Sequence, residues 1–331
     1  MKILVTGGAG YVGSVAAADL IKAGHEVIVL DSLVRGHRAS VPDAAMFVRC
    51  DLANTTALRM EFSRHKPQAV MHFAANCLVG ESMSEPFKHL DDNVVCGINL
   101  IRASVESGVR KFVLSSTANL FDCPGVATIV EGAEPRPVSP YGESKLILER
   151  MLHWMDRIHG LRYAVLRYFN AAGATRDRGE DHEPETHLIP VVLQAALGKR
   201  DRVLIYGGDY DTPDGTCIRD YVHVADLAQA HSLAIGALET RSATYHLGNG
   251  NDFSVKEVIE TARRVTGKAI KTEIVPRRPG DPAKLVADST RIRRELGWAP
   301  VFADLDLIVR SAWNWMIEHP NGYSTVPGGH S

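Results

Sequence analysis

The sequence has few cysteines, no long apolar run and almost no net charge, and each of these features excludes a class of protein. Its five cysteines are widely spaced and form no Cys-x-x-Cys pair, so we expect neither a disulfide framework nor a zinc or other metal site, and we expect a reducing, cytoplasmic compartment. No apolar stretch approaches the ~20 residues that span a bilayer, so no membrane segment is predicted. A formal net charge of -2 gives no reason to expect nucleic acid or an anionic membrane as a partner.

The first residues follow the order of a dinucleotide-binding unit. An apolar strand is predicted over 2–6 and a helix over 14–23, and between them lies the loop Gly7-Gly8-Ala9-Gly10-Tyr11-Val12-Gly13. A second buried strand, 25–30, ends at Asp31. Glycines let the backbone approach a pyrophosphate that faces the helix N-terminus, so the spacing G-x-x-G-x-x-G can serve the purpose of G-x-G-x-x-G. The order predicts a dinucleotide site, and the alternative is a plain tight turn between strand and helix.

The acid at the end of the second strand bears on which dinucleotide is bound. Asp31 would accept hydrogen bonds from the adenosine ribose and repel a 2′-phosphate, which favours NAD over NADP. Arg35 and Arg38 follow closely and could hold such a phosphate, so NADP stays as the alternative. The alternative for both arginines is that they belong to a solvated loop.

Strands and helices continue to alternate beyond this unit. Further apolar strands are predicted at 45–50, 69–73, 111–115, 163–168 and 244–247, and helices at 55–65, 86–107 and 141–158. This alternation predicts an α/β fold: a Rossmann-like, doubly wound parallel sheet with both faces covered. In such a sheet the ligand lies outside the carboxyl ends of the strands, where most of the motifs described here fall.

The character of the chain changes after Asn170. Residues 174–187 are polar and irregular, as in an excursion from the sheet. Beyond them we predict helices at 188–198, 254–266, 289–296 and 304–318, strands at 203–206 and 270–275, a helix ending near 238, and a flexible tail at 320–331. We therefore expect an NAD-binding Rossmann domain from 1–170 and 222–248, and a smaller α/β lobe for substrate from 171–221 and 249–331.

A tyrosine and a lysine lie four residues apart in Tyr141-Gly142-Glu143-Ser144-Lys145. On a helix they share one face, and an ammonium beside a phenol favours the phenolate and lowers the phenol pKa. The pair can therefore act as a general base toward an alcohol. The pattern is also common on solvated helix faces, so the pair is informative only together with the other motifs.

Several motifs together resemble a known family. The glycine loop with Asp31, the strand end Ser115-Ser116-Thr117 and the pair Tyr141 and Lys145 resemble the extended short-chain dehydrogenase/reductase superfamily. Within it, the chain resembles the UDP-glucose 4-epimerase (UDP-galactose 4-epimerase) family. The matching stretches are GGAGYVGS from Gly7, HFAANCLVGES from His72, SPYGESK from Ser139, RYFNAAG from Arg167, DGTCIRDYVHV from Asp214 and RRPGDPA from Arg277.

The resemblance implies a reversible oxidation at C4 of a UDP-hexose. Tyr141 would take the proton of the sugar 4-hydroxyl while tightly held NAD takes hydride, and after the 4-keto sugar turns over the hydride would return to its opposite face. Lys145 would lower the Tyr141 pKa and hold the nicotinamide ribose. Thr117 would bridge substrate and tyrosine, the alternative being a strand-end hydroxyl that caps a backbone amide.

The resemblance also implies the ligand contacts, residue by residue. NAD would contact Gly7, Gly10, Tyr11, Val12, Gly13, Asp31, Ser32, Asp51, Leu52, Phe73, Ala74, Ala75, Asn93, Tyr141, Lys145 and Phe169. The UDP-sugar would contact Thr117, Asn170, His187, Leu188, Tyr206, Arg219, Arg278 and Asp281. Arginine suits a diphosphate because its planar fork can bind two oxygens at once. A surface salt bridge is the alternative for either arginine.

Four positions depart from the pattern of some family members. Cys77 replaces a lysine, Ser32 replaces an asparagine after the strand-two acid, and His187 replaces an asparagine before Leu188. Leu285 aligns with a bulky tyrosine of members strict for glucose and galactose. A smaller residue there should leave room near the sugar, so we hypothesise tolerance for N-acetylated sugars.

Other activities on the same fold remain as alternatives. Dehydratases carry an acidic pair after the active-site threonine, whereas here Thr117 is followed by Ala118-Asn119. Epimerisation of another UDP-sugar, a nucleotide-sugar reductase that releases its cofactor, and a non-catalytic dinucleotide sensor are the remaining rivals. The surplus of apolar residues in helices 86–107 and 141–158 is compatible with a helical homodimer interface.

Overall fold

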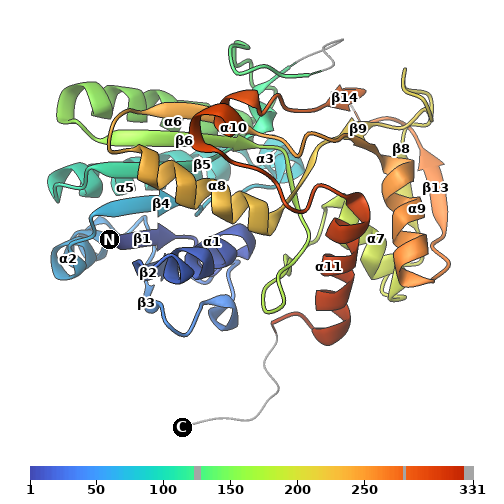
Figure 1. Ribbon diagram of the computed structural model, residues 1–331, viewed down its shortest axis with the longest axis horizontal. Helices are drawn as coiled ribbons and strands as arrows, with labels where there is room; N and C mark the ends of the chain where they lie inside the picture. Colours follow the sequence, from blue (N-terminus) through green and yellow to red (C-terminus); the bar gives the residue numbers. More distant parts are fainter. Residues whose placement is uncertain (123–127, 279–280, 324–331) are drawn as a thin grey trace, which may run out of the picture.

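A seven-stranded parallel sheet forms the larger part of the molecule in the computed structural model, which describes residues 1–122, 128–278 and 281–323 (Figure 1). Its strand order is β11-β6-β5-β4-β1-β2-β3. The strands are β1 (Lys2–Thr6), β2 (Glu26–Asp31), β3 (Met46–Arg49), β4 (Ala69–His72), β5 (Lys111–Thr117), β6 (Arg162–Tyr168) and β11 (Ala243–Leu247). The predicted Rossmann-like fold is confirmed.

The direction in which successive strands are added to the sheet reverses next to β1. The chain runs from β1 outward through β2 to β3 and then returns to β4 on the other side of β1. Ligands of open parallel sheets bind outside the carboxyl ends of the strands at such a point. Gly7 directly follows β1 and Phe73 directly follows β4, so the two loops meet at this edge.

Helices cover both faces of the sheet because successive strand side chains alternate between them. On one face, Val5 and Val29 pack with helices α1 (Tyr11–Lys22) and α8 (Val224–Ala237). On the other face, Leu4 and Leu30 pack with α2 (Thr55–His65), α5 (Cys96–Glu106) and α6 (Pro140–His159). No helix of the described residues is long and apolar enough to cross a membrane.

The predicted helix at 86–107 is present but is not uniform. It consists of α4 (Pro86–His89), a π-helical segment (Leu90–Val95) and α5. A short helix, α3 (Val79–Ser84), precedes it and was not predicted, because residues 79–84 are too few to show a helical period. Asn93 lies within the π-helical segment, a feature frequent at functional sites.

The smaller lobe lies at the carboxyl end of the sheet, on the right of Figure 1. Its helices are α7 (Leu188–Ala196), α9 (Val255–Thr266) and α11 (Leu305–Glu318), whose apolar faces share one core. Its short sheets pair β8 (Val203–Tyr206) with β13 (Thr272–Val275), and β9 (Ile218–Arg219) with β12 (Phe253–Ser254) and β14 (Lys284–Leu285). At the border of the two parts, β7 (Asn170–Ala172) pairs with β10 (Tyr221–His223).

One helix assigned to the lobe packs on the large sheet instead. Ile292 of α10 (Thr290–Leu296) and the following Trp298 belong to the same core cluster as Leu227 and Tyr245. The chain therefore returns to the first domain after β14 before it forms α11. The predicted tail lies outside the described residues from 324 onward, whereas the hydroxyl of Tyr323 accepts a hydrogen bond from Gly179 N at 3.0 Å.

Candidate active site

A cavity of about 1480 Å³ runs along the carboxyl edge of the sheet and into the lobe. Ligand pockets usually measure ~300–1,000 Å³, so this one has room for a dinucleotide and a second ligand side by side. The residues predicted to contact NAD or the UDP-sugar all line it, with the exception of Asn93. Residues from segments far apart in the sequence thus meet in one space.

The glycine loop forms the tightest wall of the cavity. Gly7 has a φ of +71°, and a Cβ atom there would lie 2.4 Å from Ala74 N. A Cβ atom on Gly13 would lie 2.2 Å from Gly7 O. Within the described residues no side chain caps the N-terminus of α1, so its first N–H groups can face a bound phosphate. This cradle fits the pyrophosphate of NAD.

Asp31 ties the glycine loop to the end of β2. Its carboxylate accepts hydrogen bonds from Ala9 N at 3.0 Å and Leu33 N at 2.8 Å. Each oxygen keeps a lone pair that a ribose hydroxyl can use. Arg35, the first alternative ligand for a 2′-phosphate, is paired with Glu81 at 2.8 Å. The arrangement favours NAD over NADP.

Arg38, the second alternative ligand for a 2′-phosphate, stacks on an aromatic ring instead. Its guanidinium lies 4.7 Å from the centre of the Phe47 ring. Asp51, which follows β3, lines the cavity close by and accepts a hydrogen bond from Ala53 N at 2.8 Å. Asp31 and Asp51 thus line this end of the cavity, where Arg35 is paired with Glu81.

Tyr141 and Lys145 lie on the first turns of α6, beneath the cavity. Ser139 caps this helix by accepting a hydrogen bond from Gly142 N at 3.1 Å. Both functional side chains are buried, and Lys145 Nζ donates to Ser115 O at 3.0 Å. The cap and the Pro140 that follows it start the helix one residue before Tyr141, which fixes the direction of both side chains.

Burial controls the ionisation of this pair. It raises the pKa of Tyr141, and Cys77 and Tyr168 raise it further, while a hydrogen bond with Thr117 lowers it. Burial also lowers the pKa of Lys145 to about 8, against the opposing effects of Cys77 and Glu149. Burial therefore raises the pKa of Tyr141 by more than its hydrogen bond with Thr117 lowers it, and the lowering by Lys145 stays a prediction.

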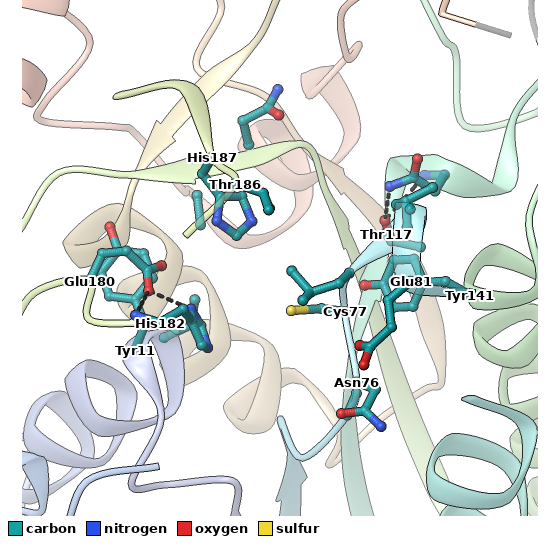
Figure 2. Close-up of a pocket in the computed structure, with 18 of the residues that line it drawn as sticks. Tyr11, Asn76, Cys77, Glu81, Thr117, Tyr141, Glu180, His182, Thr186 and His187 are labelled. Atoms are coloured by element: carbon teal, nitrogen blue, oxygen red, sulfur yellow. Dashed lines mark hydrogen bonds and ion pairs between the residues drawn. The ribbon is translucent and has the colours of Figure 1, made fainter. Parts of the chain in front are cut away.

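Thr117 ends β5 beside Tyr141, and Figure 2 shows both on the same side of the pocket. Its Oγ1 accepts hydrogen bonds from the backbone and side-chain nitrogens of Asn119, each at 3.1 Å. The predicted alternative, a strand-end hydroxyl that caps a backbone amide, is thus present. Capping leaves the hydroxyl hydrogen available, so Thr117 can still donate to Tyr141 or to a substrate oxygen.

A buried ion pair between α6 and β6 was not predicted. Glu149 accepts from Arg167 Nη2 at 2.5 Å and from Ser116 Oγ at 2.5 Å. Glu149 lies one turn beyond Lys145 on α6, and the carboxylate acts to raise the lysine pKa. An acid at this spacing on the apolar face of the helix was the available signal.

Asn93 lies behind the cavity wall rather than in it. Its amide nitrogen donates to Asn76 O at 2.9 Å and to Ser144 Oγ at 3.0 Å, and its oxygen accepts from Asn76 N at 2.8 Å. These bonds connect the loop after β4 to α6. Asn93 therefore positions the loop after β4, whose residues line the cavity, and its contact with NAD stays a prediction.

The arginines predicted for the diphosphate enter the cavity from the lobe. Arg219 donates to Asp281 at 3.0 Å and to the backbone oxygens of Ile218 and Pro282, both at 2.9 Å. The guanidinium of Arg278 lies 3.8 Å from the centre of the Tyr206 ring. Stacking holds the plane of Arg278 while its N–H edges stay available for phosphate oxygens.

The departures from the family pattern also line the cavity. Cys77 is half-buried, and desolvation raises the pKa of its thiol to about 11, so it offers no charge to a phosphate. Leu285 is half-buried and packs against the cluster of Leu120, Phe121 and Leu146. Glu180, His182 and Glu185 line the cavity without having been predicted.

Comparison with known proteins agrees with this geometry. The profile of the NAD dependent epimerase/dehydratase family matches residues 3–248. The chain belongs to this family. It is 50% identical over 329 residues to the UDP-glucose 4-epimerase of Halalkalibacterium halodurans, covering 98% of each chain.

Solved structures of family members superpose closely. The UDP-glucose 4-epimerase of Brucella ovis in complex with NAD is 41% identical, with a TM-score of 0.91, and the match covers 94% of this chain and 97% of that one. The UDP-Glc/GlcNAc 4-epimerase of Campylobacter jejuni is 41% identical, with a TM-score of 0.85, and the match covers 96% and 99%.

Proposed function

We propose that this protein is an NAD-dependent UDP-glucose 4-epimerase that interconverts UDP-glucose and UDP-galactose. The observation that carries the proposal is that Thr117 and Tyr141 share one cavity with the glycine loop and with Arg219. The reaction requires a base that takes the proton of the sugar hydroxyl, a loop that holds the dinucleotide and a side chain that binds the diphosphate. The relatives that bear this name cover nearly the whole chain.

The residues of the site can perform both directions of the reaction. Bound NAD supplies the hydride acceptor, and its cationic nicotinamide ring favours a nearby phenolate. Tyr141 takes the proton of the sugar 4-hydroxyl, with Thr117 oriented beside it, and later returns the proton to the same oxygen. Arg219 and Arg278 hold the diphosphate, so the 4-keto sugar can turn about that anchor in the wide cavity.

The decisive assay measures turnover without any added cofactor. We expect the purified protein to contain NAD and to convert UDP-galactose to UDP-glucose with no cofactor supplied. Each catalytic cycle restores the oxidised cofactor, so product should accumulate far beyond one equivalent per enzyme. If NADH instead appears in proportion to a released keto product, the protein is a dehydrogenase and the proposal fails.

We also propose that the protein accepts N-acetylated UDP-sugars. Leu285 is paired in register with Arg219 between β14 and β9, so it lines the cavity next to the proposed diphosphate ligand. The Campylobacter jejuni relative is described as a UDP-Glc/GlcNAc 4-epimerase. We expect Leu285→Tyr to lower turnover of UDP-N-acetylgalactosamine by about tenfold or more, because the larger ring fills the space for the acetyl group.

The internal control is the turnover of UDP-galactose by the same Leu285→Tyr variant. We expect this turnover to fall by less than about threefold, because the larger side chain causes only minor repacking. Leu285→Met conserves volume and should keep both activities. Absence of any turnover of UDP-N-acetylgalactosamine by the unmodified protein would contradict the proposal.

We further propose a cytoplasmic homodimer formed through α4 to α6. Phe87 is 80% exposed, Ile158 is 63% exposed and Trp154 is 53% exposed, on helices that lie against one another. Exposed apolar side chains on helices that pack together support a contact with a second copy of the chain. The free thiols of Cys50, Cys77, Cys96 and Cys217 are compatible with a reducing compartment.

Sedimentation equilibrium should show a dimer, and Ile158→Glu should convert it to a monomer by placing a charge in the apolar contact. Val301→Glu is the matched control, since Val301 is 70% exposed on a different part of the molecule. A dimer that persists in Ile158→Glu, or a monomeric unmodified protein, would refute this interface.

A further inference from the structure

Three potential metal ligands meet on the wall of the cavity opposite Tyr141. Glu180, His182 and His187 each offer one ligand atom, and these atoms all lie within 4.8 Å of one another. Figure 2 shows the three side chains close together beside Tyr11, on the far side of the pocket from Thr117 and Tyr141. The proposed reaction uses neither Glu180 nor His182.

We propose that Glu180, His182 and His187 bind one divalent transition-metal ion, of which Zn²⁺ is the best match. Two imidazoles and one carboxylate are a common ligand set for zinc, with a fourth position left to water. Tetrahedral zinc needs ligand atoms about 3.4 Å apart, so a small inward movement of the three side chains completes the site. The cysteine spacing that predicts no zinc site does not apply here, because none of these three ligands is a cysteine.

The environment of His187 is that of a zinc-bound histidine. Its Nδ1 lies 2.9 Å from Glu185 Oε1, and because a carboxylate only accepts, Nδ1 carries the hydrogen. The other ring nitrogen, Nε2, is then the one left for a metal. Carboxylates that fix the outer nitrogen of a metal-binding histidine in this way are typical of zinc sites.

Glu185 is itself held in place for this role. Its side chain is 3% exposed, and the same Oε1 accepts hydrogen bonds from Thr186 N at 2.6 Å and His187 N at 2.7 Å. The carboxylate therefore cannot swing into the cavity. It orients His187, whereas Glu180 provides the ligand oxygen.

His182 and Glu180 already touch. The Nδ1 atom of His182 is buried and pairs with the Glu180 carboxylate, whose side chain is 9% exposed. Two buried carboxylates, Glu180 and Glu185, need positive charge nearby to offset their desolvation. A divalent ion supplies that charge, and protonated histidines are the competing source, which the experiment separates.

The proposed ion would link two chain segments that form one wall of the cavity. The segment that carries Glu180 and His182 crosses between the two parts of the molecule, where Arg178 Nε donates to Ser40 O at 2.8 Å. His187 is the N-cap residue of α7 in the lobe. A metal shared by these residues would connect the crossing segment to α7, so its effect should appear in stability as well as in binding.

The test uses the full chain with its own cofactor, freed of metals by dialysis against a chelator. Calorimetric titration with Zn²⁺ should show one equivalent bound, and the melting temperature should rise with Zn²⁺. Co²⁺ should give the intense visible absorption of a tetrahedral nitrogen and oxygen site. No zinc binding, or melting temperatures that Zn²⁺ leaves unchanged, would show that protonated histidines neutralise the carboxylates and would overturn the proposal.

Two variants assign the ligands. His182→Gln should weaken Zn²⁺ binding by about a hundredfold or more and abolish the cobalt spectrum, whereas Glu185→Gln, which alters only the orienting carboxylate, should weaken it by about tenfold. His153→Gln is the control, an exposed histidine on α6. Equal binding by His182→Gln and the unmodified protein would overturn the site. Circular dichroism and the metal-free melting temperature check that each variant is folded, and these readouts do not depend on epimerase activity.

Discussion

Replacing Tyr141 with phenylalanine should lower the turnover of UDP-galactose by about a thousandfold or more while NAD remains bound. The substitution removes a single oxygen atom. The ring of Tyr141 is 8% exposed and packs equally well as phenyl, so the fold and the cofactor site should be unchanged. Turnover is measured by formation of UDP-glucose, and bound NAD by its release on denaturation.

Tyr168→Phe is the matched control. Tyr168 is also a tyrosine that lines the cavity, and its hydroxyl is bonded to Ser115. Burial raises the pKa of Tyr168 to about 12, so the two phenols share a similar environment. We expect Tyr168→Phe to retain turnover within about tenfold, since only a neutral hydrogen bond is lost. A Tyr141→Phe enzyme as active as Tyr168→Phe would refute the assignment of the base.

Most of the sheet could be predicted because its strands are continuous apolar runs. Those runs are buried on both faces, and the loops that end them carry glycine or acids. The short strands β9, β12 and β14 could not be predicted, because two residues show no periodicity. The place of α10 was missed for another reason: Ile292 and Trp298 pack on segments distant in sequence, and no local pattern records that contact.

The candidate site could be predicted where a motif fixes a local backbone. The glycine loop and the cap before Tyr141 are of this kind, since their geometry depends on neighbours in the sequence. The ionisation of Tyr141 could not be predicted, because burial by the whole fold decides it. Asn93 shows the same limit, since its π-helical turn directs the amide to Asn76 and Ser144 rather than to the cavity.

Gly13→Ala should lower the affinity for NAD by about tenfold or more and should also destabilise the fold by about 1–3 kcal/mol. The new Cβ would lie 2.2 Å from Gly7 O, a backbone atom that no side-chain rotation can move away. The glycine loop must shift, and its close approach to the pyrophosphate is lost. Bound NAD per chain and calorimetric titration of the apoprotein measure the effect.

Gly236→Ala separates this contact from the general effect of adding a methyl group to a helix. Gly236 lies in α8, and no atom comes within 4 Å of the position of its Cβ. Alanine there should stabilise the protein by about 0.5–1 kcal/mol and leave NAD binding unchanged. If Gly13→Ala binds NAD as tightly as Gly236→Ala, the loop can accept a side chain at position 13. The pyrophosphate must then lie elsewhere, because backbone proximity is the property that ties this loop to the cofactor.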